Sequence, residues 1–522
     1  MDCALKTSQI IYEMKIKFLK RILLMALACP LLATAQPNNP FNRSRAAGGG
    51  GSSKNAFNQG RKNNFNEYRA SLNAEYERMS RMPWRNQNVN APIKPVKVKP
   101  QPPRVMPDDE AARRRNNQQD EGKAIKIDDV VRPKNDNFKV QPIAPIEEQK
   151  GQSANAFTFQ YLGTAMSVRM PSDGKFRMNG TGSNSVGDVW HTLSDAKYNN
   201  MLVDCMKLRQ QYDLCDWAYL QMLQALGNAY LGKDSNEAVM LTAFVYSQSG
   251  YKLRLAEVDG RLEMLFASQH NVYDKPYVVC DGDKFYSMND GGKSIKVNSA
   301  KFPKERSLSL WVPGTPEVKE QPSAARTLTA KSYADMMAKV SVNKNLLDFY
   351  SSYPTSEVGG NFMTRWAMYA NTPMCASVKT QLYPALRRGI QGKSQRESVE
   401  RLLNWVQTAF IYEYDDKVWG GDRAFFAEES LHYPYCDCED RSILFTRLVR
   451  DLLGLKCVLV YYPGHLASAV QFTDSEALAK GGDYINVNGS KFVIADPTYI
   501  GAPVGSTMPD MDNASAKVIL LQ

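Results

Sequence analysis

The last hundred residues combine a helical pattern with three strand-like runs, and this order restricts the fold more than any other feature of the chain. Residues 439–453 repeat apolar side chains at spacings of three and four, and Gly454 follows where a helix is expected to end. The strand-like runs are residues 456–462, 467–472 and 491–495. A helix of this kind buries its apolar face against neighbouring strands. We therefore expect an α+β fold whose core is a helix packed on an antiparallel sheet.

Shifts in composition and stretches rich in Pro and Gly divide the 522 residues into five parts. Apolar residues make up 43% and charged residues 23% of the chain, which excludes a multi-span membrane protein, collagen and a coiled coil. At about 150 residues per domain, the length allows two or three domains. The parts are a signal peptide (1–35), a basic arm (36–155), a first α+β domain (156–312), a linker (313–330) and a second domain (331–522).

The first 35 residues have the pattern of a secretory signal peptide. Basic residues between positions 15 and 21 precede an apolar run, 22–32, and small residues follow at 33–35, as signal peptidase requires. The run is too short to cross a bilayer, which takes about 20 apolar residues. We therefore expect an exported protein, periplasmic or extracellular, with no transmembrane span in the mature chain. Cys29 offers a lipid anchor as the alternative, which Pro30 disfavours.

The net charge of +11 resides in the N-terminal parts. Residues 36–150 hold 22 Lys and Arg against 13 Asp and Glu, whereas the 372 residues that follow hold 38 and 39. Because the globular body is nearly neutral, we expect no nucleic-acid partner. The arm buries too little apolar surface to offset its ordering entropy, so we expect it to be disordered. It is either a solvated spacer, which we favour, or a contact for acidic polymers of the cell envelope.

Cys438 is the candidate nucleophile. Seven of the nine cysteines follow the signal peptide, and an odd number leaves at least one thiol free. Cys438 stands at the N-terminus of the expected helix, where backbone N–H groups stabilise a thiolate. Glu439 and Asp440 oppose that effect, so a cationic imidazole is needed as a partner. Cys457 lies within an apolar run and is expected in the core.

His465 and Asp496 can supply that partner and its support. His465 precedes the second strand-like run and Asp496 follows the third, so the two meet if these strands are antiparallel neighbours. An imidazole facing Cys438 would act as the base, and the carboxylate would orient the ring. The thiolate would attack an amide carbonyl, and His465 would protonate the leaving amine.

The order of these residues resembles the transglutaminase-like superfamily of cysteine acyl-transfer enzymes. The matching features, within about residues 395–505, are Asp437-Cys438-Glu439-Asp440 at a helix start, Gly454, His465 at a strand start and Asp496-Pro497-Thr498. The resemblance implies a papain-like α+β fold with Cys438 as nucleophile, His465 as base and Asp496 as the orienting carboxylate. It also implies a protein or peptide substrate, whose peptide or glutamine-type amides are hydrolysed or transferred to an amine.

The motif departs from this family at two positions. Cys436 stands where Gly usually precedes the Asp-Cys pair, and Phe425 stands where related enzymes often carry a side-chain donor to the oxyanion. A phenyl ring cannot donate a hydrogen bond. Tyr435 or Trp419 could take its place; otherwise the site is weakened, because loss of one such donor costs about 10²- to 10³-fold in rate.

A zinc site is the alternative use of the same region. His432, Cys436 and Cys438 could supply three ligands, but the usual two-residue spacer between cysteines and a fourth ligand are missing. No phosphate-binding loop is evident either. We therefore expect neither a metal nor a cofactor.

The first domain could be a degenerate copy of the second. Its residues 216–231 and 237–249 have helical spacings, and a strand-like run follows the second of them. In this alignment Ser235 replaces Cys438, and Arg261 stands near the histidine position, so the copy would be inert. Duplication and chance similarity remain equally open.

Two classes of function therefore compete. The first is an exported cysteine peptidase, amidase or acyl transferase that uses the Cys-His-Asp triad. The second is a catalytically inactive envelope or adhesion protein that uses the same fold to bind a partner. The complete triad favours the enzyme.

Overall fold

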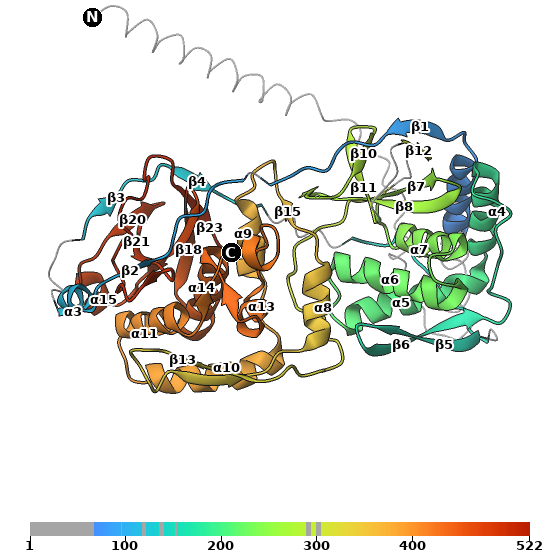
Figure 1. Ribbon diagram of the computed structural model, residues 1–522. Helices are drawn as coiled ribbons and strands as arrows, with labels where there is room; N and C mark the ends of the chain where they lie inside the picture. The colour runs from blue at the N-terminus through green and yellow to red at the C-terminus, as the bar shows by residue number, and fades with distance from the viewer. Residues whose placement is uncertain are drawn as a thin grey trace, which may run out of the picture. The chain divides into compact units, whose positions relative to one another are not determined.

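The structure is a computed structural model that describes residues 67–95, 97–116, 122–134, 140–151, 154–288, 294–298 and 304–522 (Figure 1). These residues belong to one compact unit. The expected signal peptide and the first part of the arm lie outside the described residues. The chain is α+β, as expected, and its larger sheets curve into a nearly closed antiparallel barrel and a half-barrel. None of the helices within the described ranges is both long and apolar enough to cross a membrane.

The part of the chain expected as the first domain packs helices against an antiparallel sheet. Helices α6 (Asp216–Leu231) and α7 (Asn236–Gln248) confirm the expected helical ranges, and α7 is buried over most of its length. Further elements are β5 (Ala154–Tyr161), β6 (Thr164–Pro171), α4 (Ser183–Leu193), a 3-10 helix (Ala196–Tyr198) and α5 (Asn199–Gln211). The sheet contains, in order among the described residues, β1 (Arg85–Asn88), β12 (Ser294–Val297), β7 (Leu253–Val258), β8 (Arg261–Ala267), β11 (Asp283–Ser287) and β10 (Tyr277–Cys280).

The second domain carries the helix and strands expected from its sequence. Helix α14 (Cys438–Leu453) packs on the hairpin of β18 (Lys456–Tyr462) and β19 (His465–Gln471), and β19 pairs antiparallel with β21 (Ser490–Ala495). These bounds confirm the three strand-like runs to within two residues. The sheet runs β3 (Ala124–Ile125), β20 (Tyr484–Val487), β21, β19, β18, β23 (Lys517–Leu520) and β4 (Asp129–Val131) within the described ranges.

Shorter elements surround this core. They are β13 (Arg326–Thr329), β14 (Met337–Val340), α8 (Lys344–Ser352), β15 (Ser356–Glu357) with β9 (Asn271–Val272), α9 (Thr364–Asn371), α10 (Ala376–Ile390), α11 (Gln395–Thr408), β16 (Ile411–Tyr412), α12 (Asp415–Val418), α13 (Ala427–His432), β17 (Tyr435–Cys436), α15 (Ser475–Ala479) and β22 (Tyr499–Ile500). Helix α11 packs against α14, and the carbonyl of Gln407 in α11 accepts a hydrogen bond from Arg441 near the start of α14.

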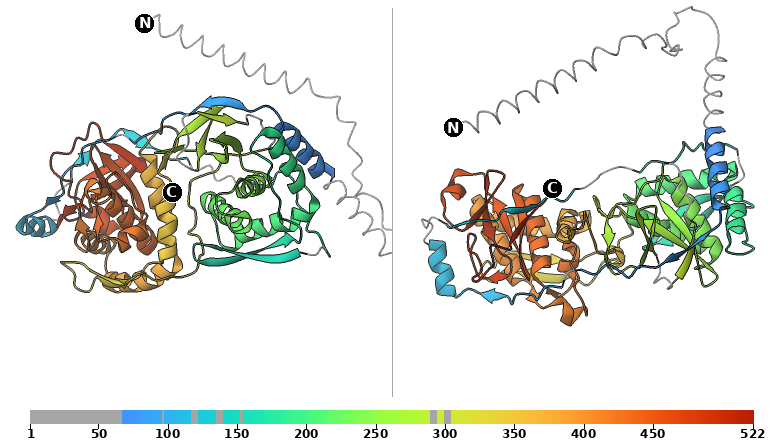
Figure 2. Two further views of the ribbon diagram at one scale, coloured as in Figure 1. Left: turned by 45° about the vertical axis from the view of Figure 1, so that its right-hand side comes forward. Right: turned by 90° about the horizontal axis from the view of Figure 1, so that it is seen from above.

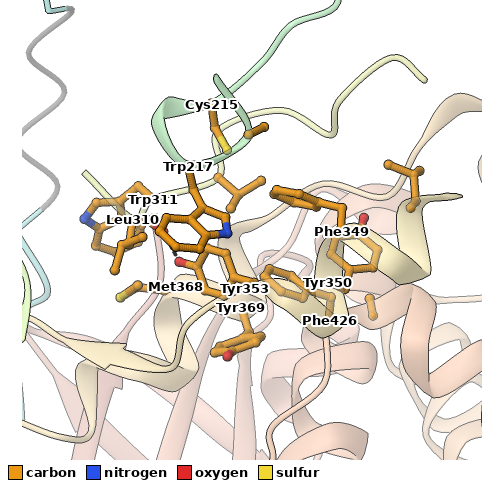
Figure 3. Close-up of a cluster of buried hydrophobic side chains, with 14 of the residues drawn as sticks. Cys215, Trp217, Leu310, Trp311, Phe349, Tyr350, Tyr353, Met368, Tyr369 and Phe426 are labelled. Carbon is orange, nitrogen blue, oxygen red and sulfur yellow. Dashed lines mark hydrogen bonds between the residues drawn. The ribbon is translucent and has the colours of Figure 1, made fainter. Parts of the chain in front are cut away.

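Buried aromatic side chains continue the core from the first domain into the second (Figure 3). Trp217 comes from α6, and the hydroxyl of Tyr353 donates to the backbone carbonyl of Leu310. The ring centroid of Phe426 lies 5.2 Å from that of Tyr353 and 4.4 Å from that of Tyr369. The parts expected as the first and second domains therefore contribute to one hydrophobic core.

The arm differs from the disordered segment expected over 36–155. Residues 67–80 are helical, and Tyr76 within them is fully buried. Further along, the arm supplies edge strands: β1 pairs with β12, β2 (Arg104–Val105) with β22, β3 with β20 and β4 with β23, while α3 (Asp108–Asn116) follows β2. Both views of Figure 2 show this blue-to-cyan segment lying along the body. The composition of the arm does not reveal these strands, because short edge strands are held by backbone hydrogen bonds, which need few apolar side chains.

The arm also crosses the turn that precedes His465. The backbone N–H of Gln101 donates to the carbonyl of Gly464 at 2.7 Å, and the side-chain amide of Gln101 donates to the carbonyl of Pro463 at 3.3 Å. A methyl group on Gly464 would lie only 2.1 Å from the carbonyl oxygen of Lys99. The arm backbone can approach this turn so closely only because residue 464 is glycine.

Candidate active site

Cys438 is the first residue of α14. The helix begins here because Asp440 Oδ2 accepts a hydrogen bond from the backbone N–H of Asp437 at 3.4 Å, and it ends at Gly454, whose φ is 66°. Backbone N–H groups in a first helical turn have no intrahelical acceptor. The thiol is buried, with the residue 6% exposed, and donates to Glu439 Oε2 at 3.2 Å.

The surroundings of Cys438 keep its thiol protonated. Burial raises the thiol pKa well above its ordinary value, and the carboxylates of Glu439 and Asp437 raise it further. A hydrogen bond from the backbone N–H of Leu466 lowers the pKa without outweighing these effects. The helix N-terminus alone therefore does not produce a thiolate. The Leu466 contact also puts the sulfur beside the residue that follows His465.

His465 and Asp496 meet as the strand order predicts. His465 Nε2 lies 2.8 Å from Asp496 Oδ2, and the two residues are 2% and 3% exposed. His465 Nδ1 is also buried and has no hydrogen-bond partner among the described residues. Because the carboxylate occupies Nε2, Nδ1 is the nitrogen that remains to accept a proton.

Backbone donors fix the carboxylate of Asp496. Its Oδ1 accepts hydrogen bonds from the backbone N–H groups of Thr498 at 2.8 Å and Tyr499 at 3.3 Å. Gln407 of α11 holds the same loop, since its side-chain amide donates to the carbonyl of Asp496 at 3.1 Å. A carboxylate that accepts several such bonds can hold an imidazole in one orientation.

Two side chains of α14 connect the helix to the rest of the site. Ser442 Oγ donates to the carbonyl of Leu466 at 2.8 Å, which ties the helix to β19. The guanidinium of Arg441, a residue only 1% exposed, donates to the carbonyls of Gln407 at 3.1 Å and Phe410 at 2.9 Å. The elements that carry the three candidate catalytic residues are therefore fixed to one another by buried hydrogen bonds.

The sequence excluded the side chain of Phe425 as oxyanion donor and named Tyr435 or Trp419 as replacements. Phe425 is fully buried, and its backbone N–H donates to Asp440 Oδ1 at 2.8 Å. The indole of Trp419 packs edge-on against Tyr433, with 4.8 Å between centroids, and Tyr435 is 39% exposed. Sequence reasoning missed Tyr412, whose hydroxyl is buried and lacks a hydrogen-bond partner in the described part of the chain.

Acidic side chains crowd the first turn of α14. Among the described residues, three groups of side chains have ligand atoms within 4.8 Å of one another. They are Asp437 with Cys438 and Glu439, Asp415 with Asp437 and Asp440, and Asp415 with Asp422 and Glu439. Burial raises the pKa of Asp415 to about 8, and Glu439 adds to the rise. Arg365 pairs with Asp422 and lies 3.9 Å from Glu439 Oε1. Carboxylate oxygens are the ligands that a hard cation prefers. Protonation of some of these carboxyl groups would equally relieve the repulsion between their negative charges.

The remaining sequence candidates lie elsewhere. The zinc set of His432, Cys436 and Cys438 is not among the close ligand groups found in the described ranges. Cys457 is buried as expected, and burial raises its thiol pKa to about 12.

No family model and no curated protein matches this chain.

Proposed function

We propose that the protein is an exported transglutaminase-like cysteine peptidase, amidase or acyl transferase. The observation that carries the proposal is the buried His465 ring. It is bound through Nε2 to Asp496, and its Nδ1 has no partner among the described residues. It precedes the strand residue whose N–H contacts Cys438 Sγ. A nucleophile at a helix start, a base and a carboxylate are the parts that acyl transfer requires. The signal-peptide pattern supports export.

The steps follow from these positions. His465 Nδ1 takes the proton of the Cys438 thiol, and Asp496 stabilises the imidazolium that results. The thiolate attacks the carbonyl carbon of an amide, forming a C–S bond while the carbonyl electrons move to oxygen. The C–N bond then breaks, and His465 returns its proton to the departing amine. Water or a second amine releases the acyl group from the sulfur.

The strand orders support the duplication that the sequence left open. In the second domain, helix α14 precedes a sheet ordered β20-β21-β19-β18-β23, and in the first domain α7 precedes one ordered β10-β11-β8-β7-β12. The two orders are the same when the strands are matched in chain order. We therefore infer that the first domain is a degenerate copy of the second.

The equivalent site of the first domain has lost its chemistry. Asn236 begins α7 as Cys438 begins α14, and its side-chain oxygen accepts from the N–H of Leu262 at 2.9 Å. Leu262 corresponds to Leu466, so Arg261 replaces His465. This alignment differs by one residue from the sequence alignment, since Ser235 is the N-cap of α7. An amide and a guanidinium cannot perform nucleophilic catalysis, so the copy serves binding or support.

The second candidate function is an inactive binding protein of the cell envelope. The raised thiol pKa, the hydrogen bond from the thiol to Glu439 and the burial of the site favour it. A protein of this kind would need no proton transfer to His465, and the basic arm could contact acidic polymers.

Release of ammonia from a glutaminyl peptide, and transfer of that peptide to a fluorescent primary amine, test the enzyme against the binding protein. The mature wild-type protein should catalyse one of these reactions or cleave a peptide from a diverse library. Cys438→Ala and His465→Ala should abolish it, whereas Cys457→Ala should retain it. Activity that survives Cys438→Ala would refute the triad, and a wild type inactive on every substrate would favour the binding protein.

A further inference from the structure

Tyr412 lies next to the candidate active site and carries a hydroxyl that donates to no acceptor in the described ranges. Tyr412 ends strand β16, which pairs in parallel with β17 so that Tyr412 lies opposite Cys436, two residues before Cys438. The hydroxyl is buried and has no hydrogen-bond partner within the described residues. A buried polar group without a partner costs about 1–3 kcal/mol, and a ligand that accepts a hydrogen bond from this hydroxyl would remove that cost.

The ring of Tyr412 lies beside the first turns of α14. The guanidinium of Arg441, which lies three residues after Cys438 on α14, is 5.4 Å from the ring centroid. Burial raises the pKa of the Tyr412 phenol, and the charges that raise it further are, in order of size, those of Cys438, Asp437 and Glu439. The phenol therefore lies close to the start of α14 and keeps its proton.

We propose that Tyr412 is the side-chain oxyanion donor of this enzyme, acting together with the backbone N–H of Cys438. The assignment rests on the proposed function, and it resolves the absence of a donor at Phe425. A protonated phenol opposite Cys436 and beside Arg441 is suited to this role because it donates one hydrogen bond and retains its proton throughout the reaction.

The chemical role is confined to stabilising charge. When Cys438 Sγ bonds to the carbonyl carbon, the electron pair of the C=O bond moves to oxygen, and Tyr412 O–H and the Cys438 N–H donate to that oxygen. When the tetrahedral intermediate collapses, the pair returns and the C–N bond breaks. The proton on the leaving amine comes from His465, so Tyr412 neither gains nor loses one.

Acylation and alkylation of the same sulfur separate this role from a structural one. Acylation of Cys438 by p-nitrophenyl acetate passes through an oxyanion, whereas displacement of iodide from iodoacetamide does not. In the mature full chain, followed by mass spectrometry, Tyr412→Phe should slow acylation of Cys438 by about 100-fold. Alkylation of Cys438 should change by less than 2-fold.

Tyr414→Phe is the matched control, because its ring lies 5.5 Å from that of Tyr412 and it also loses only a hydroxyl. In Tyr414→Phe, the rates of acylation and of alkylation of Cys438 should both equal those of the wild type. Unchanged acylation in Tyr412→Phe, or an equal fall in acylation and alkylation, would overturn the role of Tyr412 while the triad stands. A wild-type Cys438 that is acylated no faster than Cys457 would overturn the proposed function and this assignment with it.

Discussion

Replacing Gln407 by Leu should loosen the loop that carries Asp496. The side-chain amide of Gln407 donates to the carbonyls of Asp496 at 3.1 Å, Tyr499 at 2.8 Å and Ala502 at 3.1 Å, and its oxygen accepts from the N–H of Gly501 at 3.2 Å. The residue is 2% exposed, so water cannot readily replace these bonds. Leu has nearly the same volume and leaves little cavity, which isolates the loss of hydrogen bonding.

The size of the effect follows from the groups left without partners. A buried unpaired polar group costs about 1–3 kcal/mol, and some of the loop carbonyls regain water when the loop moves. We therefore expect Gln407→Leu to lower the free energy of unfolding by about 3 kcal/mol, measured by urea denaturation. Because Asp496 then holds His465 less firmly, acylation of Cys438 should also slow.

Gln381→Leu is the control for this prediction. Gln381 makes similar bonds, with its amide donating to the carbonyls of Ser341 at 3.1 Å and Ser377 at 2.9 Å, but it is exposed. Water can replace those bonds, so this variant should lose less than about 1 kcal/mol. Equal losses in the two variants, or a loss below 1 kcal/mol for Gln407→Leu, would refute the reasoning.

Three further predictions concern the arm and the acidic side chains. Gly464→Ala should expose the arm near residue 100 to proteolysis, because the new methyl group meets the arm backbone; Gly489→Ala, with the same φ of 79° and open space around it, should not. Glu439→Gln removes the charge that most raises the thiol pKa of Cys438, so alkylation of that thiol at neutral pH should accelerate several-fold, and an unchanged rate would contradict this. Folding raises the pKa of Asp415 from 3.8 to about 8, so the folded state binds the proton more tightly. Stability should therefore fall as the pH rises from about 4 through 8, and Asp415→Asn should flatten that fall in urea denaturation; a slope identical to that of the wild type would exclude this carboxyl as its source.

The helix and strands around the candidate site could be predicted because their patterns are local. The spacing within α14 and the apolar runs of β18, β19 and β21 need only neighbouring residues to be recognised. The contact of His465 with Asp496 then follows from the antiparallel pairing of β19 with β21, although β20 lies between these two strands in the chain. These features depend on periodicity and chain order, which the sequence displays directly.

Features that depend on distant backbone contacts could not be predicted in this way. Strands β3 and β4 are two and three residues long and are held at sheet edges by hydrogen bonds that leave no side-chain pattern. The position of Tyr412 opposite Cys436 depends on the pairing of β16 with β17, two strands of two residues each that have no distinctive sequence pattern. The raised pKa of Cys438 likewise depends mainly on burial, which the sequence does not display. The acidic neighbours in the sequence indicated only that the pKa would be raised.

Competitive alkylation of the cysteines tests the central claim most directly. Iodoacetamide at neutral pH, with each site quantified by mass spectrometry, compares Cys438 with Cys457, two buried thiols whose pKa values are both raised. If His465 takes the proton of Cys438, this cysteine should react at least about 10-fold faster than Cys457, and His465→Ala should remove the difference. Equal rates in the wild type, or a difference that persists in His465→Ala, would contradict the account.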